Sequence, residues 1–145
     1  MSVVLTTQTT GNGSAIQGTP FTGFDNGQFL IYSFFNVTPS NAGNGGYITG
    51  GDPMTFLGVS DFLKSTYAPL QLTIFSQNGG GAGHSGFAYY YRPGGLGNAA
   101  TIANGKFQVL QPGNANSPMV EIAQGAYPAA VLTDIIVANG CFVRI

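Results

Sequence analysis

Six Asn-Gly dipeptides divide the chain into short segments, and their spacing constrains the fold more than any other feature. The asparagines are Asn12, Asn26, Asn44, Asn78, Asn104 and Asn139. A two-residue β-turn of type I′ needs positive φ at both central positions, which asparagine tolerates and glycine adopts at no steric cost. Asn-Gly between apolar runs is therefore a strong short-range signal for a β-hairpin, and it predicts a succession of short antiparallel strands.

The segments between these dipeptides have the composition and alternation of β-strands. β-branched and aromatic side chains dominate 28–37. In other segments, such as 70–77, polar and apolar side chains alternate, as in a half-buried antiparallel strand. We expect strands at 28–37, 70–77, 87–92, 106–111, 131–137 and 140–145, with weaker ones at 3–9, 47–49, 54–59 and 119–123. Asn139-Gly140 is expected to join the 131–137 and 140–145 strands, either as a hairpin or as a bulge in one long strand.

Helix signals are few in this sequence. Residues 60–64 hold the best one, because Ser60 can cap a first turn and Asp61 and Lys64 are spaced i, i+3. The pair Ser117-Pro118 is compatible with the start of a helix or with a strand. About eight short strands without amphipathic helices between them predict an all-β fold. We expect a single antiparallel β-sandwich domain over 1–145, jelly-roll-like, with at most one or two short helical turns. Local patterns do not encode strand order, so an immunoglobulin-like sandwich and a Greek-key barrel stay open.

The chain carries few charges for a folded domain. Its 145 residues include only 5 acidic and 4 basic side chains, and the formal net charge is -1. Charged residues make up about a quarter of a typical soluble domain, where they keep molecules apart. A chain without that repulsion tends to associate. We therefore expect this protein to bind copies of itself or a larger protein surface.

The same composition argues against several classes of function. Four scattered basic residues do not form the basic face that nucleic-acid binding requires. No run approaches the ~18 apolar residues of a membrane span, and the first residues do not resemble a secretory signal. Cys141 is the only cysteine and is expected to be a buried thiol. The acidic residues show no metal-site or paired-carboxylate spacing. We expect no nucleic-acid, membrane, metal or cofactor partner.

One motif resembles a nucleotide-binding loop but lies in the wrong context. Residues 81–86 match G-x-G-x-x-G, yet a strand-like segment follows where a helix should begin, so we interpret the match as a loop between strands. His84 lies in this loop and is the only histidine, so any Ser-His-Asp or Cys-His arrangement would depend on it. A glycine-rich loop holds a general base poorly. We therefore expect no enzymatic activity.

Tyr89, Tyr90, Tyr91 and Arg92 form the stretch best suited to contact a partner. Tyrosine offers a rigid apolar ring with a hydrogen-bonding tip, as in surfaces that hold sugars or proteins. Strand alternation would place Tyr89 and Tyr91 in the core and leave Tyr90 outside. Tyr90 and Arg92 are therefore the candidate interface residues. The alternative is a carbohydrate-binding or host-attachment module of a virion, with all three tyrosines as a stacking platform.

From about residue 47 onward, five segments carry a resemblance to known proteins. They are 46–53 (Gly-Tyr-Ile-Thr-Gly-Gly-Asp-Pro), 91–94 (Tyr-Arg-Pro-Gly), 103–109 (Ala-Asn-Gly-Lys-Phe-Gln-Val), 117–121 (Ser-Pro-Met-Val-Glu) and 125–129 (Gly-Ala-Tyr-Pro-Ala). In these segments the chain resembles small structural proteins of tailed bacteriophages, of the head decoration or capsid cement type. The resemblance implies a non-enzymatic β-sandwich, assembled in the host cytoplasm. It also implies a homodimer or homotrimer on the outer capsid surface of the virion, which bridges subunits of the major capsid protein lattice and stabilises the shell.

Overall fold

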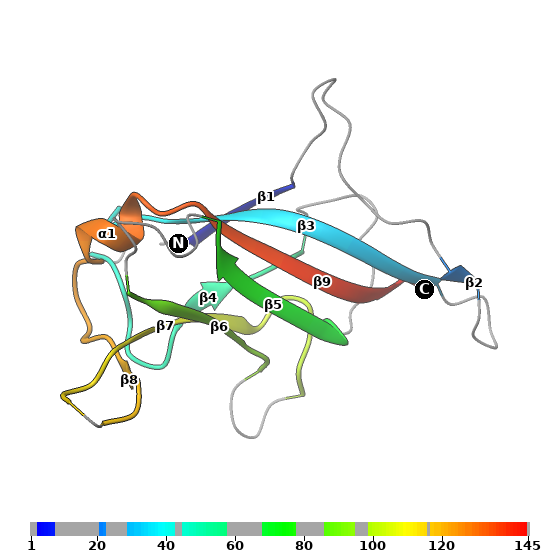
Figure 1. The fold of residues 1–145 in the computed structure, drawn as a ribbon. Coiled ribbons are helices and arrows are strands. Elements are labelled where there is room, and N and C mark those ends of the chain that lie inside the picture. Colours follow the sequence, from blue (N-terminus) through cyan, green and yellow to red (C-terminus); the bar gives the residue numbers. More distant parts are fainter. Residues whose placement is uncertain are drawn as a thin grey trace.

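The structure consists of two antiparallel β-sheets that pack against each other (Figure 1). The computed structural model describes residues 3–7, 21–22, 29–42, 45–57, 68–77, 86–94, 99–115 and 117–144. The strands and the one short helix are β1 (Val3–Thr7), β2 (Phe21–Thr22), β3 (Phe29–Pro39), β4 (Asp52–Met54), β5 (Gln71–Ser76), β6 (Ala88–Arg92), β7 (Gly105–Gln111), β8 (Val120–Glu121), α1 (Ala129–Leu132) and β9 (Ile136–Arg144). This architecture confirms the predicted all-β sandwich with little helix, while the jelly-roll connectivity is not confirmed.

The strand order places β5 at an edge of the first sheet and β6 at an edge of the second. The first sheet has five strands in the order β1-β3-β9-β5, with β2 also paired to β3. The second has four strands in the order β4-β7-β6, with β8 also paired to β7. β3 and β9 form the centre of the first sheet and pair continuously from Phe29↔Arg144 to Val37↔Ile136. Within the described residues, β5 pairs only with β9 and β6 pairs only with β7.

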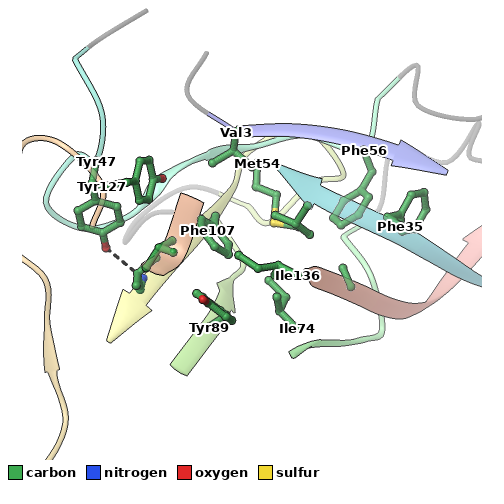
Figure 2. Packing of buried hydrophobic residues seen from close by; sticks show 14 of the residues in the cluster. Val3, Phe35, Tyr47, Met54, Phe56, Ile74, Tyr89, Phe107, Tyr127 and Ile136 are labelled. Atoms are coloured by element: carbon green, nitrogen blue, oxygen red, sulfur yellow. Dashed lines mark hydrogen bonds between the residues drawn. The ribbon is translucent and has the colours of Figure 1, made fainter. Parts of the chain in front are cut away.

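The core lies between the sheets and is rich in aromatic rings (Figure 2). Phe56 makes edge-to-face contacts with Phe35 and Phe142, both with ring centroids 5.1 Å apart. The rings of Phe35 and Phe142 also meet, at 5.8 Å. Such aromatic pairs are each worth about 0.5–1.5 kcal/mol beyond the area that they bury. The alternation predicted for 106–111 is confirmed, because Phe107 and Val109 are fully buried.

The strand predicted at 131–137 is wrong. Residues Ala129–Leu132 form the helix α1, in which only Val131 is buried, and β9 begins at Ile136. Alanine and leucine favour a helix, and Pro128 precedes it at a position where proline's missing N–H costs nothing. Ile135, which the period-two pattern placed beside Val131, is 50% exposed. The alternation there arises by coincidence across a helix, a turn and a strand.

The Asn139-Gly140 dipeptide forms neither the hairpin nor the bulge that we expected. It lies in the middle of β9, where Asn139 pairs with Phe34 and Gly140 with Ser33 in unbroken register. A Cβ atom on Gly140 would lie 2.5 Å from Cδ1 of Leu72. Real Cβ atoms essentially never approach so closely, so this glycine makes room for packing against β5 rather than for a turn.

Asn104-Gly105, the other described case, is not a two-residue hairpin turn either. The Asn104 side chain accepts a hydrogen bond from the Thr101 N–H (2.8 Å) and donates one to the Ala99 carbonyl (2.8 Å), which orders the loop before β7. A Cβ atom on Gly105 would overlap the ring of Tyr91. This glycine therefore also serves packing between β6 and β7.

Three weaker strands are shorter or displaced relative to their predictions. Tyr47 makes only an isolated bridge to Gly125, so the strand expected at 47–49 is wrong. The strand expected at 54–59 occupies Asp52–Met54 instead, and the one expected at 119–123 is reduced to Val120–Glu121. The helical turn expected at 60–64 lies outside the described residues, as do 81–85 with His84. Over the ranges described, no helix has the length and apolar character needed to cross a membrane.

Candidate functional site

The tyrosines of β6 divide between the core and the surface as strand alternation predicted. Tyr89 is 6% exposed and stacks on Phe107, with ring centroids 5.7 Å apart. Tyr91 is half-buried and contacts the ring of Phe56 edge-on at 5.9 Å. Tyr90 is 54% exposed. A stacking platform of all three tyrosines is therefore not formed, and Tyr90 is the one that a partner can reach.

Tyr90 belongs to a polar surface that we call the outer β6–β7 face. Tyr90 pairs with Gln108 and Arg92 pairs with Lys106, and side chains directly opposite in an antiparallel pair share one face of the sheet. Glu121 of β8 belongs to the same face. Its carboxylate is hydrogen-bonded to Gln108 and is close enough to Arg92 for the positive charge to lower its pKa. The outer β6–β7 face thus combines an aromatic ring, an amide and charges of both signs.

A buried tyrosine anchors Glu121 from behind this face. The Tyr47 hydroxyl donates to Oε1 of Glu121 at 2.5 Å, and the Gly50 N–H donates to the same oxygen at 2.6 Å. The Tyr47 hydroxyl also accepts a hydrogen bond from the Val109 N–H, at 3.4 Å (Figure 2). Glu121 therefore links β8 to the turn after Tyr47 and to the core.

A second tyrosine and carboxylate pair lies next to the first and is fully buried. The Tyr127 hydroxyl donates to Oδ2 of Asp52, and the Ile48 N–H donates to Oδ1 at 2.9 Å. Asp52 is 0% exposed, and the rings of Tyr47 and Tyr127 meet edge-on at 5.6 Å. The sequence analysis did not predict this pairing. No local signal joins the two, because they are separated by 75 positions.

The protonation states of these pairs follow from burial and hydrogen bonding. Burial raises the pKa of Tyr47 and Tyr127, and their hydrogen bonds to carboxylates raise it further. Burial alone would raise the pKa of Glu121, but hydrogen bonds from Tyr47, Gly50 and Gln108 and the charge of Arg92 hold it below its usual value. The tyrosines are donors and Glu121 is an ionised acceptor at neutral pH. Asp52 is fully buried and therefore out of reach of a ligand. The cluster of Tyr47, Glu121, Asp52 and Tyr127 thus has a structural role, in which it links segment 45–54 to segment 120–127.

The depressed pKa of Glu121 predicts a specific loss of stability in acid. A group whose pKa is lower in the folded state contributes stability above its unfolded pKa, about 4.3 for glutamate, and loses it as the pH falls through the folded pKa. We expect Glu121→Gln to unfold more easily than the wild type at pH 7, with the difference shrinking below pH ~4. Urea denaturation at a series of pH values measures both. A difference that is constant with pH would contradict the assignment.

The described surface also exposes several large apolar side chains. Those with relative exposure of at least 38% are Val4, Leu57, Leu70, Phe75, Tyr90, Met119, Val120, Leu132 and Ile135. They are spread over both sheets, the helix α1 and the loops. Single exposed apolar residues are ordinary in folded proteins. In this chain, however, only nine charged residues are available to separate them, so the surface is suited to association.

The remaining candidates from the sequence are placed as follows. The Cys141 thiol is buried, as expected. His84, the G-x-G-x-x-G motif except Gly86, and two of the acidic residues, Asp25 and Asp61, lie outside the described residues. No model of a known protein family, no curated protein and no solved structure matches this chain.

Proposed function

We propose that this chain is a virion structural protein, a capsid decoration or cement protein that binds the outer surface of a capsid as a homodimer or homotrimer and stabilises the shell. The observation that carries the proposal is the combination of nine large exposed apolar side chains among the described residues with a sequence that has only nine formal charges. Interfaces between proteins are depleted of charge at their centres and enriched in tyrosine and arginine. The resemblance of 46–129 to phage decoration proteins supplies the kind of partner.

The outer β6–β7 face is the part of the surface that we expect to contact the capsid. Tyr90 projects from it beside Arg92 and Gln108, and tyrosine and arginine are the residue types that most often dominate binding energy. A single contact of this kind buries about 1,600 Å² or less. Several contacts per oligomer would add avidity well beyond that of each one.

Rebinding to capsids that lack the protein tests the proposal. We expect the purified oligomer to cosediment with such shells, and Tyr90→Ser to weaken binding by about tenfold or more, as for an interface anchor. Val4→Ser is the matched control, because Val4 is 48% exposed but lies on the other sheet. A folded protein that stays monomeric at high concentration and does not bind shells would refute the proposal.

Binding to shells should depend little on salt. The outer β6–β7 face carries only three charges, Arg92, Lys106 and Glu121, and they are of both signs. Salt weakens mainly the interactions between exposed charges. We expect the affinity to change by less than about threefold between roughly 0.05 M and 0.5 M salt. A tenfold loss over that range would show that charge drives the binding and would contradict this mode of docking.

The alternative function is a carbohydrate-binding or host-attachment module, and one observation bears on it. The exposed Tyr90 lies opposite Gln108, and a ring beside an amide is a usual combination for holding a sugar. Tyr90 would act without Tyr89, which is packed against Phe107. A glycan-binding screen separates the two functions, because a capsid cement protein has no need to bind any glycan.

A further inference from the structure

Two basic side chains lie side by side on the outer β6–β7 face. Arg92 of β6 stands directly opposite Lys106 of β7 in the antiparallel ladder of the second sheet (Figure 1). Opposite residues of such a ladder share one face of the sheet, with Cβ atoms about 4.5–5.5 Å apart. Arg92 is exposed and Lys106 is half-buried, so both are accessible at the surface.

No direct contact within the described part of the chain neutralises this pair. Among those residues, neither Arg92 nor Lys106 has a salt-bridge partner, and neither side chain donates a hydrogen bond. Like charges that stand directly opposite each other in a sheet are destabilising. The free protein therefore holds together two cations that repel each other, and they are two of the four basic residues of the whole chain.

Glu121, the acidic residue of the same face, does not serve as their counter-ion. Its Oε1 atom accepts hydrogen bonds from the Tyr47 hydroxyl at 2.5 Å and from the Gly50 N–H at 2.6 Å, and Gln108 donates to the carboxylate as well. Arg92 acts on Glu121 through its charge, but these two described residues form no salt bridge. With two bases and one acid, the face keeps one positive charge in excess.

The chemistry of this face favours the carboxylate of a protein as its partner. The planar guanidinium of Arg92 presents paired N–H donors that match a carboxylate, and the Lys106 ammonium adds a second positive charge. A nucleic acid, in contrast, needs a wide basic face that neutralises several phosphates, and two cations do not provide one. Tyr90 lies two positions before Arg92 on the same face and is 54% exposed, which adds an apolar ring of the kind enriched in protein interfaces.

We propose that Arg92 and Lys106 together bind the carboxylate of an aspartate or glutamate side chain of a capsid subunit, while Tyr90 packs against an apolar group beside that carboxylate. The inference rests on the proposed function, because that function supplies the partner. Side chains two positions apart in a strand are about 7 Å apart. The carboxylate and the apolar group of the partner are therefore also about 7 Å apart.

A carboxylate held in this way is compatible with binding that salt hardly weakens. In the complex the capsid subunit covers the ion pair, and covered pairs are screened much less by salt than exposed ones. Removal of one charge has a large effect instead, because the other charge is left covered and poorly paired. Substitution of either cation is therefore expected to weaken shell binding far more than salt does.

Charge substitutions test this assignment on capsids that lack the protein. We expect Arg92→Gln and Lys106→Gln each to weaken binding to such shells by at least about thirtyfold. Arg144→Gln is the matched control, because it removes the same charge from β9 of the other sheet, and it should leave the affinity unchanged. A control that weakens binding as much as the other two, or a Lys106→Gln variant that binds like the wild type, would overturn the proposal.

The stability of the free protein distinguishes a binding role of Lys106 from a structural one. Because Lys106 stands opposite Arg92 and forms no salt bridge with a described residue, its charge should not stabilise the fold. We expect the urea midpoint of Lys106→Gln to be no lower than that of the wild type. A lower midpoint would assign Lys106 to the support of the fold and would count against the proposal.

A pair of blocked tripeptides tests the site without capsids. Acetyl-Phe-Ser-Glu-amide places a ring and a carboxylate two positions apart, and acetyl-Phe-Ser-Gln-amide differs only in lacking the charge. We expect the acidic peptide to shift the Nε–Hε resonance of Arg92 saturably and to bind at least about tenfold more tightly than the neutral one. Lys106→Gln should reduce that difference. Equal binding of the two peptides to the wild type, or binding of neither, would overturn the proposal.

Together the two kinds of experiment separate this inference from the proposed function. If the wild type binds shells and both glutamine variants bind them equally well, the carboxylate site fails and the proposed function stands. If the wild type prefers the acidic peptide but binds no shell, the site binds carboxylates and the proposed function fails.

Discussion

Gly46→Ala is expected to destabilise the protein by more than about 3 kcal/mol, and it is the largest effect that we predict for a single methyl group. Gly46 has φ +113, a conformation that residues with a side chain rarely adopt. A Cβ atom there would overlap the Gly125 carbonyl oxygen and lie 2.9 Å from Cα of Ala126. These are backbone atoms that cannot rotate away. The bridge in which Tyr47 and Gly125 exchange hydrogen bonds at 2.7 and 3.0 Å would have to open.

Gly45→Ala is the matched control for this prediction. Gly45 also has a positive φ, +80, but a Cβ atom there would have nothing within 4 Å. We expect it to cost only the backbone strain, about 1–2 kcal/mol. Urea denaturation of both variants compares the free energies of unfolding directly. Equal losses would mean that the close approach of 46 to 125–126 does not contribute to stability.

Tyr127→Phe is expected to lower the free energy of unfolding by about 3 kcal/mol, because it removes the hydroxyl that donates to Asp52. Asp52 is 0% exposed, so no water can replace the lost donor without a rearrangement. The Ile48 N–H would be left to hold the carboxylate at 2.9 Å. The turn 48–52 and the start of β4 should loosen together, which amide hydrogen exchange would detect.

Tyr90→Phe is the matched control for Tyr127→Phe. It also removes a tyrosine hydroxyl, but from a side chain that is 54% exposed. Surface substitutions of this kind usually change stability by less than about 0.5 kcal/mol, so the difference between the two variants isolates the buried hydrogen bond. If Tyr127→Phe is as mild as Tyr90→Phe, the pairing of Tyr127 with Asp52 contributes little. The free energy of unfolding of the double variant Tyr127→Phe with Asp52→Asn would then show whether burial of the Asp52 carboxylate lowers stability.

The parts of the fold that sequence patterns predicted are those where one face of a strand is buried and the other is not. Phe107 and Val109 alternate with Lys106 and Gln108 for that reason, and the exposed position of Tyr90 followed from the same rule. The pattern failed at 131–137, where a short helix and a strand happen to place apolar residues two apart. It also failed at Gly140, because the sequence does not distinguish a glycine that turns the chain from one that makes room for Leu72.

The features that escaped prediction depend on contacts between distant segments. Tyr47 reaches Glu121 across 74 positions, and Tyr127 reaches Asp52 across 75. Lys106 stands opposite Arg92 because β6 pairs with β7, and strand order is not encoded locally. The candidate interface could therefore be named from the sequence as Tyr90 and Arg92, but the carboxylates that support it and the lysine beside Arg92 could not.

The place of β9 in the first sheet sets the order in which this fold can be completed. β9 lies between β3 and β5, and its pairing with β3 runs from Phe29↔Arg144 to Val37↔Ile136. Contacts that close such long loops make folding slow, because chain entropy is lost before the contacts form. During synthesis β3 and β5 are made long before the strand that joins them. Until β9 emerges from the ribosome, both therefore offer bare edges to neighbouring chains, and correct folding competes with aggregation.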